Sequence, residues 1–557
     1  MPTRKNIRDL STEELDKLIK AFKGIQDKHP EDPDSFFHIA GYHGQPFRGA
    51  GYENSDWWGG YCHHGNVLFP TWHRAYLWRL EKALQTVPGC GDVTIPFWNQ
   101  VKDDEIPPIF LKRRYEFQNK DKIDNPLYSY KLQRGFYDKL ARTVKAEQEN
   151  GADQAPEEQL VDYGKFFHYE TVRYPYSGLV GPQDIRTTEL HNEVISQLGD
   201  ETVNGLLNLR ICQWLQGTNR TPGIRTQYNQ CLRAPNYTVF SNTTSATKYN
   251  DDHSPHSSGL AECEEPLVCP IEKPHNGMHL AVGGYDMADN RDYSGANGDM
   301  GENDTASFDP IFFFHHCFID LVFWSWQVSK GKTEKLEITP FYPGTNSVDS
   351  QGPTPGMLAG EWLSMKTPLH PFMKYEDNNT QLPFTSEDVV DISRLGYSYD
   401  KSDILQPHKE DERQTLITST LRVSGIDRGL IAGSFVILVC EKASQDLKSE
   451  EQKPKVVGYE PVFSRWHVAG CANCRNSLSV TFHAPIAKVT SATTGEKLLD
   501  PIPDTSKVDY EVRLLTNDRK TGKKTIWAPD PQPPMDLVER KFEVPLPKTR
   551  LRSVVVR

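Results

Sequence analysis

Histidines set inside apolar, helix-patterned segments constrain this chain more than any other feature. In the stretch FPTWHRAYLWRLEKAL, residues 69–84, apolar residues recur at helical spacing and place His73 on the inward face. A buried imidazole must either be hydrogen-bonded as a neutral group or bind a ligand. Taken alone, His73 would be assigned as a hydrogen-bonded core residue, because most inward histidines are.

Two further clusters change this interpretation. His275 and His279 are four residues apart, so a helix presents both imidazoles on one face. The stretch DPIFFFHHCFID, residues 309–320, holds His315 and His316 behind an aspartate that can cap a helix and a proline suited to its first position. Histidine clusters without ligating carboxylates favour copper or zinc, and no HExxH motif supplies the base of a zinc peptidase. The sequence therefore predicts a metal site built on helices.

The first and third clusters resemble the two copper signatures of the tyrosinase and hemocyanin superfamily. The matching stretches are HGNVLFPTWHRAYLWRLE, residues 64–81, and residues 309–320. The resemblance implies a mainly α catalytic domain in which a four-helix bundle holds a binuclear site of two copper ions, with dioxygen as co-substrate. The implied ligands are His43, His64 and His73 for one copper and His275, His279 and His316 for the other.

Neighbours of these ligands take supporting roles in the same resemblance. Cys62 precedes His64 by two positions, as in the thioether-linked pair of fungal tyrosinases and molluscan hemocyanins. A free buried cysteine is the alternative, because free cysteine is common in protein cores. His63 and His315, each adjacent to an implied ligand, are expected to support or pack against the site and not to bind copper.

Three more residues near the second copper are candidates for substrate chemistry. Asn276 and Glu272 resemble the pair that holds and polarises a water, which then takes the phenol proton. Glu272 could instead simply be an acid in the first turn of the helix that carries His275. Phe312 resembles the aromatic residue beside the bound phenol ring, and a plain core position is its alternative. We therefore predict catalytic roles for Glu272, Asn276 and Phe312.

The character of the chain changes near residue 400. Residues 1–400 form the expected catalytic domain, and residues 401–413 are polar and charged like an exposed linker. Strand-like runs follow at 415–423, 433–441, 477–482 and 510–515. They predict that residues 414–557 form a β-rich, sandwich-like domain, so the chain is expected to be multidomain.

The resemblance to fungal tyrosinases extends into this C-terminal domain, which covers the copper site in that family. The motif YSY at 397–399 resembles the tyrosine motif that closes the fungal catalytic core, and we expect it to contact Arg4. Phe463 is the first candidate for the side chain that fills the place of the phenol, with Val462 and Trp466 as alternatives. Cys471 and Cys474 form a lone CxxC pair, for which copper delivery and a structural role stay open.

The leading hypothesis is therefore a latent tyrosinase that hydroxylates monophenols to o-diphenols and oxidises o-diphenols to o-quinones, as in melanin formation. An activating protease that cuts the linker would release the covering domain. A catechol oxidase or o-aminophenol oxidase without monophenolase activity is an alternative, against which Asn276 and Glu272 argue. A hemocyanin-like oxygen carrier is the alternative from a different class.

Charge and cysteine content limit partners and location. The net charge of -12 leaves no basic surface for nucleic acid or an anionic membrane as the main partner. No apolar run reaches the ~18 residues of a membrane span, and no signal peptide is seen. The 10 cysteines are too sparse for a disulfide framework. We expect an intracellular, cytoplasmic protein that acts on small phenols, and oligomer formation is left open.

Overall fold

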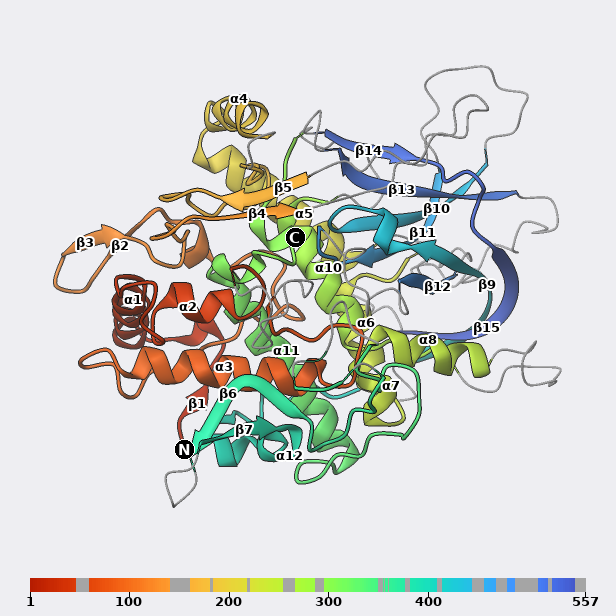
Figure 1. Cartoon of the computed structure of the whole chain (residues 1–557), viewed down its shortest axis with the longest axis horizontal. Coiled ribbons are helices and arrows are strands. Elements are labelled where there is room, and N and C mark those ends of the chain that lie inside the picture. The colour runs from red at the N-terminus through yellow and green to blue at the C-terminus, as the bar shows by residue number, and fades with distance from the viewer. Residues whose placement is uncertain are drawn as a thin grey trace, which may run out of the picture.

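The structure is a computed structural model with a helical domain that ends at β8 (Ser398–Tyr399) and a C-terminal β domain that begins at β9 (Arg413–Asp427) (Figure 1). It describes every residue except 47–59, 141–160, 181–183, 218–220, 254–265, 286–294, 349–353, 355, 359, 376–380, 408–412, 443–454, 467–477, 486–508, 519–522 and 546–557. The chain crosses between the two domains within the segment predicted to be a linker, and the boundaries of that linker stay a prediction.

Helices supply most of the helical domain, and their ends follow the sequence signals. Ser11 and Glu14 form the expected capping box at the start of the first helix, and Pro70 lies in the first turn of the helix that carries His73. The helices are α1 (Thr12–Gln26), α2 (Phe36–Gly41), α3 (Phe69–Gln85), α4 (Ile185–Ser196), α5 (Asp200–Gln216), α6 (Ile224–Cys231), α7 (Tyr237–Ser241), α8 (Thr243–Asp252), α10 (Glu272–Gly283), α11 (Ile311–Lys330) and α12 (Ser386–Val389).

Short two-stranded pairings decorate this domain. They are β1 (Thr3–Arg4) with β8, β2 (Arg114–Glu116) with β3 (Lys122–Asp124), β4 (Phe136–Leu140) with β5 (Val161–Lys165), and β6 (Pro368–Tyr375) with β7 (Gln381–Thr385). The β1–β8 pair confirms the contact expected between the YSY motif and the N-terminus, because the Arg4 guanidinium lies 3.6 Å from the centre of the Tyr397 ring. The first residues of the chain are thereby fixed to the end of the helical domain.

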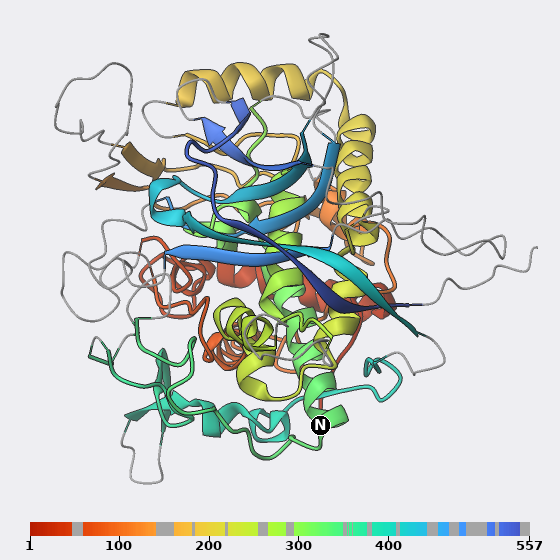
Figure 2. The same cartoon turned by 90° about the vertical axis from the view of Figure 1, so that its right-hand side faces the viewer.

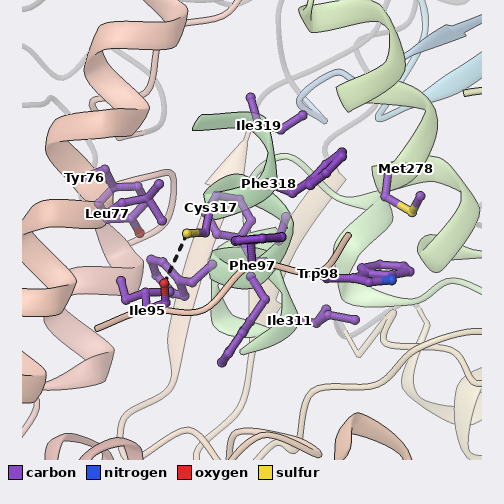
Figure 3. Packing of buried hydrophobic residues seen from close by; sticks show 14 of the residues in the cluster. Tyr76, Leu77, Ile95, Phe97, Trp98, Met278, Ile311, Cys317, Phe318 and Ile319 are labelled. Carbon is purple, nitrogen blue, oxygen red and sulfur yellow. Dashed lines mark hydrogen bonds between the residues drawn. The ribbon is translucent and has the colours of Figure 1, made fainter. Parts of the chain in front are cut away.

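The helix α11 forms the centre of the hydrophobic core (Figure 3). Its Cys317 thiol donates to the carbonyl of Ile95 at 3.2 Å, and the next residue, Phe318, packs among other buried aromatic residues. Among the described helices, α11 alone is long and apolar enough on average to cross a membrane, but 89% of that stretch is buried inside the protein. It is therefore a core helix, in which polar residues such as His316 and Asp320 interrupt the apolar run.

The C-terminal domain is a β-sandwich, as predicted. One sheet has the order β11 (Lys455–Val462), β10 (Phe435–Glu441), β13 (Tyr510–Asp518), β14 (Lys523–Trp527), and the other has the order β12 (Ser479–Pro485), β9, β15 (Met535–Pro545). The described strand pairs of both sheets are antiparallel. Side chains from both sheets, among them Val423, Ile437 and Phe482, form a core of their own.

The strand β10 joins this sandwich to the helical domain because its two faces are buried against different partners. Ile437 and Val439 point into the sandwich core, whereas Val436, Leu438 and Cys440 belong to the core of the helical domain. Successive side chains of a strand point to opposite faces, so one fully buried strand serves both cores. The strands of the C-terminal domain consequently lie across the helices that carry the histidines (Figure 2).

Candidate metal centre

The histidines predicted as ligands meet in the interior of the helical domain. α3 carries His73, α10 carries His275 and His279, α11 carries His316, His43 follows α2, and His64 lies in the loop before α3. All six are buried. They form one cluster of His43, His64 and His73 and a second of His275, His279, His315 and His316, with the donor atoms of each cluster within 4.8 Å of one another. Local spacing on α3, α10 and α11 thus produces two adjacent sites.

In the first cluster, the contacts of the imidazoles expose one nitrogen to a shared centre. His43 Nδ1 donates to the carbonyl of Asn303 at 3.1 Å, and His73 Nδ1 donates to the carbonyl of Phe69 at 2.8 Å. A carbonyl only accepts, so Nε2 keeps its lone pair. Within the described part of the chain, the Nε2 atoms of His43, His64 and His73 are buried without a hydrogen-bond partner. Buried polar atoms are nearly always satisfied, so this group indicates a metal position.

The second cluster repeats this arrangement. His279 Nδ1 donates to the carbonyl of Met300 at 2.9 Å, and His275 Nδ1 donates to Asn276 Oδ1 at 2.9 Å. The Nε2 atom of His316 lies 3.2 Å from His275 Nε2 and 3.4 Å from His279 Nε2. Three imidazole nitrogens therefore converge on one point, as the ligands of a single metal ion would.

His315 belongs to the second cluster by distance, but its hydrogen bond differs from those of the other three. Gln100 Nε2 donates to His315 Nδ1 at 2.8 Å, and the Tyr228 hydroxyl donates to Gln100 Oε1 at 2.6 Å, which fixes the orientation of the amide. His315 Nδ1 therefore accepts, and the ring proton lies on Nε2. A protonated Nε2 cannot bind a metal, so this geometry favours His316 as the ligand.

Burial keeps these imidazoles neutral, which is the state that binds metal. Removal from water lowers the pKa of His73 to about 3 and holds the pKa values of the other cluster members well below the usual range. Neighbouring histidines lower the pKa values further, because two imidazolium ions at such distances repel each other. Three neutral imidazoles per site, without a carboxylate in either described cluster, fit copper.

Comparison with known proteins decides the family. Residues 33–329 match the family model described as the common central domain of tyrosinase. The tyrosinase of Aspergillus oryzae is 46% identical over 508 residues, which cover 87% of this chain and 88% of that protein. The chain belongs to the tyrosinase family.

Further relatives of the tyrosinase family agree with this assignment. A tyrosinase of a Hahella species is 42% identical over 522 residues, with 87% of this chain and 88% of that protein covered. The solved tyrosinase of Burkholderia thailandensis at low pH has a TM-score of 0.71 and 36% identity, and covers 96% of this chain and 100% of its own. A holo-protyrosinase from Aspergillus oryzae shares the fold, with a TM-score of 0.57, 19% identity and 95% of both chains covered.

Family and site together define the type of enzyme. The protein is a tyrosinase-family oxidoreductase that oxidises phenols with dioxygen and uses two copper ions as its cofactor. The two histidine clusters are the places where the residues of this chain fit those ions. The mainly α catalytic domain and the C-terminal β domain expected from the sequence are confirmed.

The loop that carries His64 is held from the C-terminal domain. Cys62 Sγ lies 3.4 Å from His64 Nδ1, and Arg465 Nη2 donates to Cys62 Sγ at 2.9 Å and to the carbonyl of His43 at 3.3 Å. Asp304 pairs with Arg465 at 3.3 Å. Burial raises the pKa of the Cys62 thiol to about 11, against the lowering effect of Arg465. The sulfur is thus placed beside the imidazole, and the thioether between Cys62 and His64 stays a prediction.

Glu272 and Asn276 lie where the sequence places them, on the first turns of α10. Both carboxylate oxygens of Glu272 accept hydrogen bonds, Oε1 from the Gly65 amide at 2.7 Å and Oε2 from the Thr243 amide at 2.8 Å. Burial raises the pKa of Glu272, and these bonds act in the opposite direction. The Gly65 bond connects α10 to the loop of the first cluster. Glu272 therefore joins the two halves of the site, a contact that neither proposed role had included.

Phe312 and Phe463 approach the histidines from different domains. The Phe312 ring on α11 is fully buried, 4.1 Å from the ring of His316 and 4.9 Å from that of His43. The Phe463 ring, from the end of β11, stacks on His279 with 4.1 Å between ring centres and an angle of 23°. Phe463 also lines a cavity of about 200 Å³ between the domains, together with Asn276. Phe463 thus occupies the open face of the second cluster, whereas Phe312 packs behind it.

Several residues that shape the site were not predicted from the sequence. They are Gln100, Tyr228, Met300, Asn303, Asp304 and Arg465. Backbone carbonyls carry no sequence signal, and a single arginine in a β domain matches no motif. Cys471 and Cys474 lie outside the described residues, so the role of the CxxC pair stays a prediction.

Proposed function

We propose that this chain is a tyrosinase in the narrow sense, made in a latent form. It would hydroxylate monophenols to o-diphenols and oxidise o-diphenols to o-quinones once the C-terminal domain is displaced. The observation that carries the proposal is the Phe463 ring, which is 1% exposed and stacked on His279 in the place where a phenol ring would lie. A side chain of the C-terminal domain that imitates a substrate ring is typical of an inhibited precursor.

Each of the two histidine clusters would hold one copper ion. The first ion would be bound by His43, His64 and His73, and the second by His275, His279 and His316. Bound copper ions supply the binding and reduction of dioxygen that phenol oxidation needs. The protein contributes fixed donor directions, because the carbonyls of Phe69, Met300 and Asn303 hold Nδ1–H of their histidines. These three ligands are therefore held in one orientation by the protein.

Hydroxylation of a monophenol needs removal of the phenol proton, for which α10 offers two groups. Asn276 lines the cavity beside Phe463. Its Oδ1 accepts a hydrogen bond from His275, and this bond fixes the orientation of the side-chain amide. Glu272 is a buried carboxylate with a raised pKa, a property that suits a proton acceptor. We propose that Asn276 orients a water and that Glu272 makes this water basic, so that the phenol binds as phenolate.

Latency follows from the way in which the C-terminal domain is attached. Phe463 comes from the same domain as Arg465, whose guanidinium contacts the loop of the first cluster. Displacement of the domain would remove both contacts and open the His279 face. Because the chain between Tyr399 and Arg413 is the covalent connection, a protease that cuts residues 401–413 is the proposed activating partner.

The test is oxygen uptake by the copper-loaded chain with a monophenol and with an o-diphenol, before and after limited proteolysis within residues 400–413. Activity on both substrates that appears only after cutting is the expected result. Activity on the o-diphenol alone would indicate a catechol oxidase and overturn the roles of Asn276 and Glu272. Reversible oxygen binding without turnover of either substrate would leave only a carrier.

We also propose an intracellular location. Among the described residues the cysteines form no disulfide, and the buried neighbours Cys231 and Cys269 have sulfurs 3.8 Å apart. Free thiols at such distances are typical of a reducing compartment. Fractionation of cells that make the protein, followed by immunoblotting, tests this, and recovery from the culture medium would overturn it.

A further inference from the structure

A buried lysine in β5 stands at the centre of a charged cluster that the copper chemistry above does not use. Lys165 Nζ donates to the carbonyl of Gly178 at 2.5 Å, and lies 3.0 Å from Asp299 Oδ1 and 3.4 Å from Glu302 Oε2. The side chains of Lys165, Asp299 and Glu302 are at most 2% exposed. A buried charge is costly unless it is paired, so this ammonium strongly favours one position of the two carboxylates.

Two tyrosines beside Lys165 donate hydrogen bonds to the same carboxylates. The Tyr169 hydroxyl donates to Asp299 Oδ2 at 2.6 Å, and the Tyr163 hydroxyl donates to Glu302 Oε2 at 2.6 Å. Both tyrosines come from the region around β5, as Lys165 does. Segment 299–303, which carries the carboxylates, is thereby attached to β5 through side chains and not through a strand pairing.

Segment 299–303 also touches the histidines. The carbonyl of Met300 accepts from His279 Nδ1 at 2.9 Å, and the carbonyl of Asn303 accepts from His43 Nδ1 at 3.1 Å. His279 belongs to the second cluster and His43 to the first. Five consecutive residues therefore present one carbonyl to a proposed ligand of each copper, and each carbonyl belongs to the residue directly after a carboxylate that Lys165 holds.

The other face of the segment is fixed by close backbone packing. A Cβ atom on Gly283, at the end of α10, would lie 2.4 Å from the Cα atom of Gly301, so the two chains approach as closely as glycines permit. The amide of Gly298 donates to the carbonyl of Gly283 at 3.0 Å. The segment is thus clamped between α10, which carries His275 and His279, and the cluster around Lys165.

We propose that Lys165 is a positioning residue for both copper ions, acting through segment 299–303. Its ammonium holds Asp299 and Glu302, these residues fix the Met300 and Asn303 carbonyls, and the carbonyls hold Nδ1–H of His279 and His43. Each histidine then offers Nε2 in a fixed direction. The inference rests on the ligand assignment proposed above. It extends the support of the copper ligands from the carbonyls that contact them to Lys165, which does not contact a ligand itself.

The test is copper retention by Lys165→Met, which keeps the length of the side chain and removes its charge. Wild type, variant and controls are equilibrated with chelators of graded strength, and the copper per chain is measured by atomic absorption. Loss of an outer partner of a metal ligand typically costs 10–100-fold in metal affinity, so we expect Lys165→Met to bind copper at least about tenfold more weakly at both sites. A variant that keeps wild-type affinity would overturn the proposal.

Two controls separate positioning from general stability. Leu18→Ala removes a buried side chain of α1, a helix that carries no histidine, and it should lower the thermal midpoint without lowering copper affinity. The double variant Lys165→Met/Glu302→Gln restores the charge balance without the ion pair. Positioning predicts that it recovers thermal stability but not copper affinity, and recovery of both would show that Lys165 only balances charge.

Milder variants keep the test open if Lys165→Met does not fold. Tyr169→Phe and Tyr163→Phe each remove one hydrogen bond to the cluster and should lower copper affinity several-fold, whereas unchanged affinity in both would count against the proposal. His279→Ala serves as the reference for loss of a proposed ligand. A wild-type chain that holds fewer than two copper ions would contradict the ligand assignment itself, which is a different outcome from failure of the Lys165 variants alone.

Discussion

Adjacent histidines with equal burial differ in this protein because different groups lie at their ring nitrogens. Gln100 donates to His315, whereas the Nε2 atom of His316 lies 3.2 Å from that of His275. We therefore predict that His316→Gln loses one of two copper ions, and that His315→Gln retains both with a change in affinity of less than about tenfold. Copper per chain, measured after dialysis, distinguishes the two variants.

The amide partner of His315 provides the matched control for this comparison. Gln100→Glu would replace the donor by an acceptor, so His315 Nδ1 would take the proton and its Nε2 would gain a lone pair. That variant should weaken discrimination between the two histidines, and His316→Gln in its background should keep more copper than His316→Gln alone. Equal copper loss in both backgrounds would show that the tautomer of His315 has no influence.

The buried histidines also determine how metal-free protein responds to acid. Burial lowers the pKa of His63 and of His73 to about 3, whereas an imidazole in the unfolded chain takes up its proton near pH 6.5. Between these values the unfolded state binds more protons, so stability falls as the pH falls below about 6.5. The free energy of unfolding should lose up to about 1.4 kcal/mol per pH unit for each such histidine.

His63 allows this pH dependence to be measured for one group, because it is not a proposed ligand. The slope of the unfolding free energy against pH reports how many protons the chain takes up on unfolding. His63→Gln should reduce this number by up to one between pH 6 and pH 4, measured by denaturant unfolding of the metal-free chain at each pH. An unchanged slope would mean that His63 is protonated in the folded state. The neighbour Asn66, which contacts His63 Nδ1 at 3.3 Å, can also bond to glutamine.

At the scale of secondary structure elements, one carboxylate joins four segments of the helical domain. Asp320 on α11 accepts from Arg74 of α3 at 2.6 Å, from Tyr397 at 2.6 Å and from Tyr399 of β8 at 2.7 Å, and it lies 3.3 Å from Arg4 of β1. Burial alone would raise the pKa of Asp320, but the two arginines lower it below its ordinary value. The stability that it contributes is therefore present above about pH 4 and is lost as the pH falls through the lowered pKa.

We predict that Asp320→Asn destabilises the helical domain by about 3 kcal/mol or more, because it removes the carboxylate that pairs with the buried Arg74 guanidinium and leaves Arg4 paired with Glu81 alone. A lowered midpoint in thermal unfolding of the metal-free chain checks this. Asp400→Asn is the matched control, since Asp400 follows the same tyrosine motif but is exposed. A midpoint of Asp320→Asn equal to that of the control would show that the network adds little.

Sequence patterns predicted the elements that carry local signals. The capping box gave the start of α1, and helical spacing gave α3, α10 and α11 together with the histidines on them. β11, β14 and β15 were not predicted, because strands that alternate poorly or are buried on both faces carry a weak periodic signal. The pairing of β1 with β8 was expected only as a contact with Arg4, because partners almost 400 residues apart share no local pattern.

The same limit applies to the site. Residue types and spacing predicted a metal site on the helices that carry His73, His275, His279 and His316, whereas the set of six ligands was implied by the resemblance to the copper signatures. Their fixed orientation comes from the carbonyls of Phe69, Met300 and Asn303 and from the amide of Gln100, and these groups become neighbours only through the fold. Phe463 was predicted by resemblance alone, since a phenylalanine in a β domain has no signal of its own.

At the scale of the whole molecule, ionic contacts on both sides of the histidines hold the C-terminal domain in place. Lys273 beside the second cluster pairs with Glu460 at 2.5 Å, and Asp251 at the end of α8 accepts from Arg422 of β9 through both oxygens at 2.7 Å. Burial raises the pKa of Glu460, an effect that Lys273 opposes. Because the pKa of Glu460 is higher in the docked state, the docked state binds more protons than the released state just above the ordinary pKa of glutamate. Mild acid therefore does not favour release of the domain through this pair.

The Arg422 contact is the better one to weaken, because its guanidinium can be removed without a buried charge being left near the copper sites. Arg422→Met loses a bidentate ion pair that is about one quarter exposed, which we expect to weaken docking by about 1 kcal/mol and to raise the open population about fivefold. The uncut chain should then become active on an o-diphenol at a lower urea concentration than wild type.

Arg513→Met, which removes a pair with Glu511 inside the C-terminal domain, is the control and should leave that concentration close to wild type. If both variants shift activation equally, latency depends on the stability of the sandwich itself and not on its docking. A shift confined to Arg422→Met would show that the closed state is held across the interface, where Phe463 lies on His279.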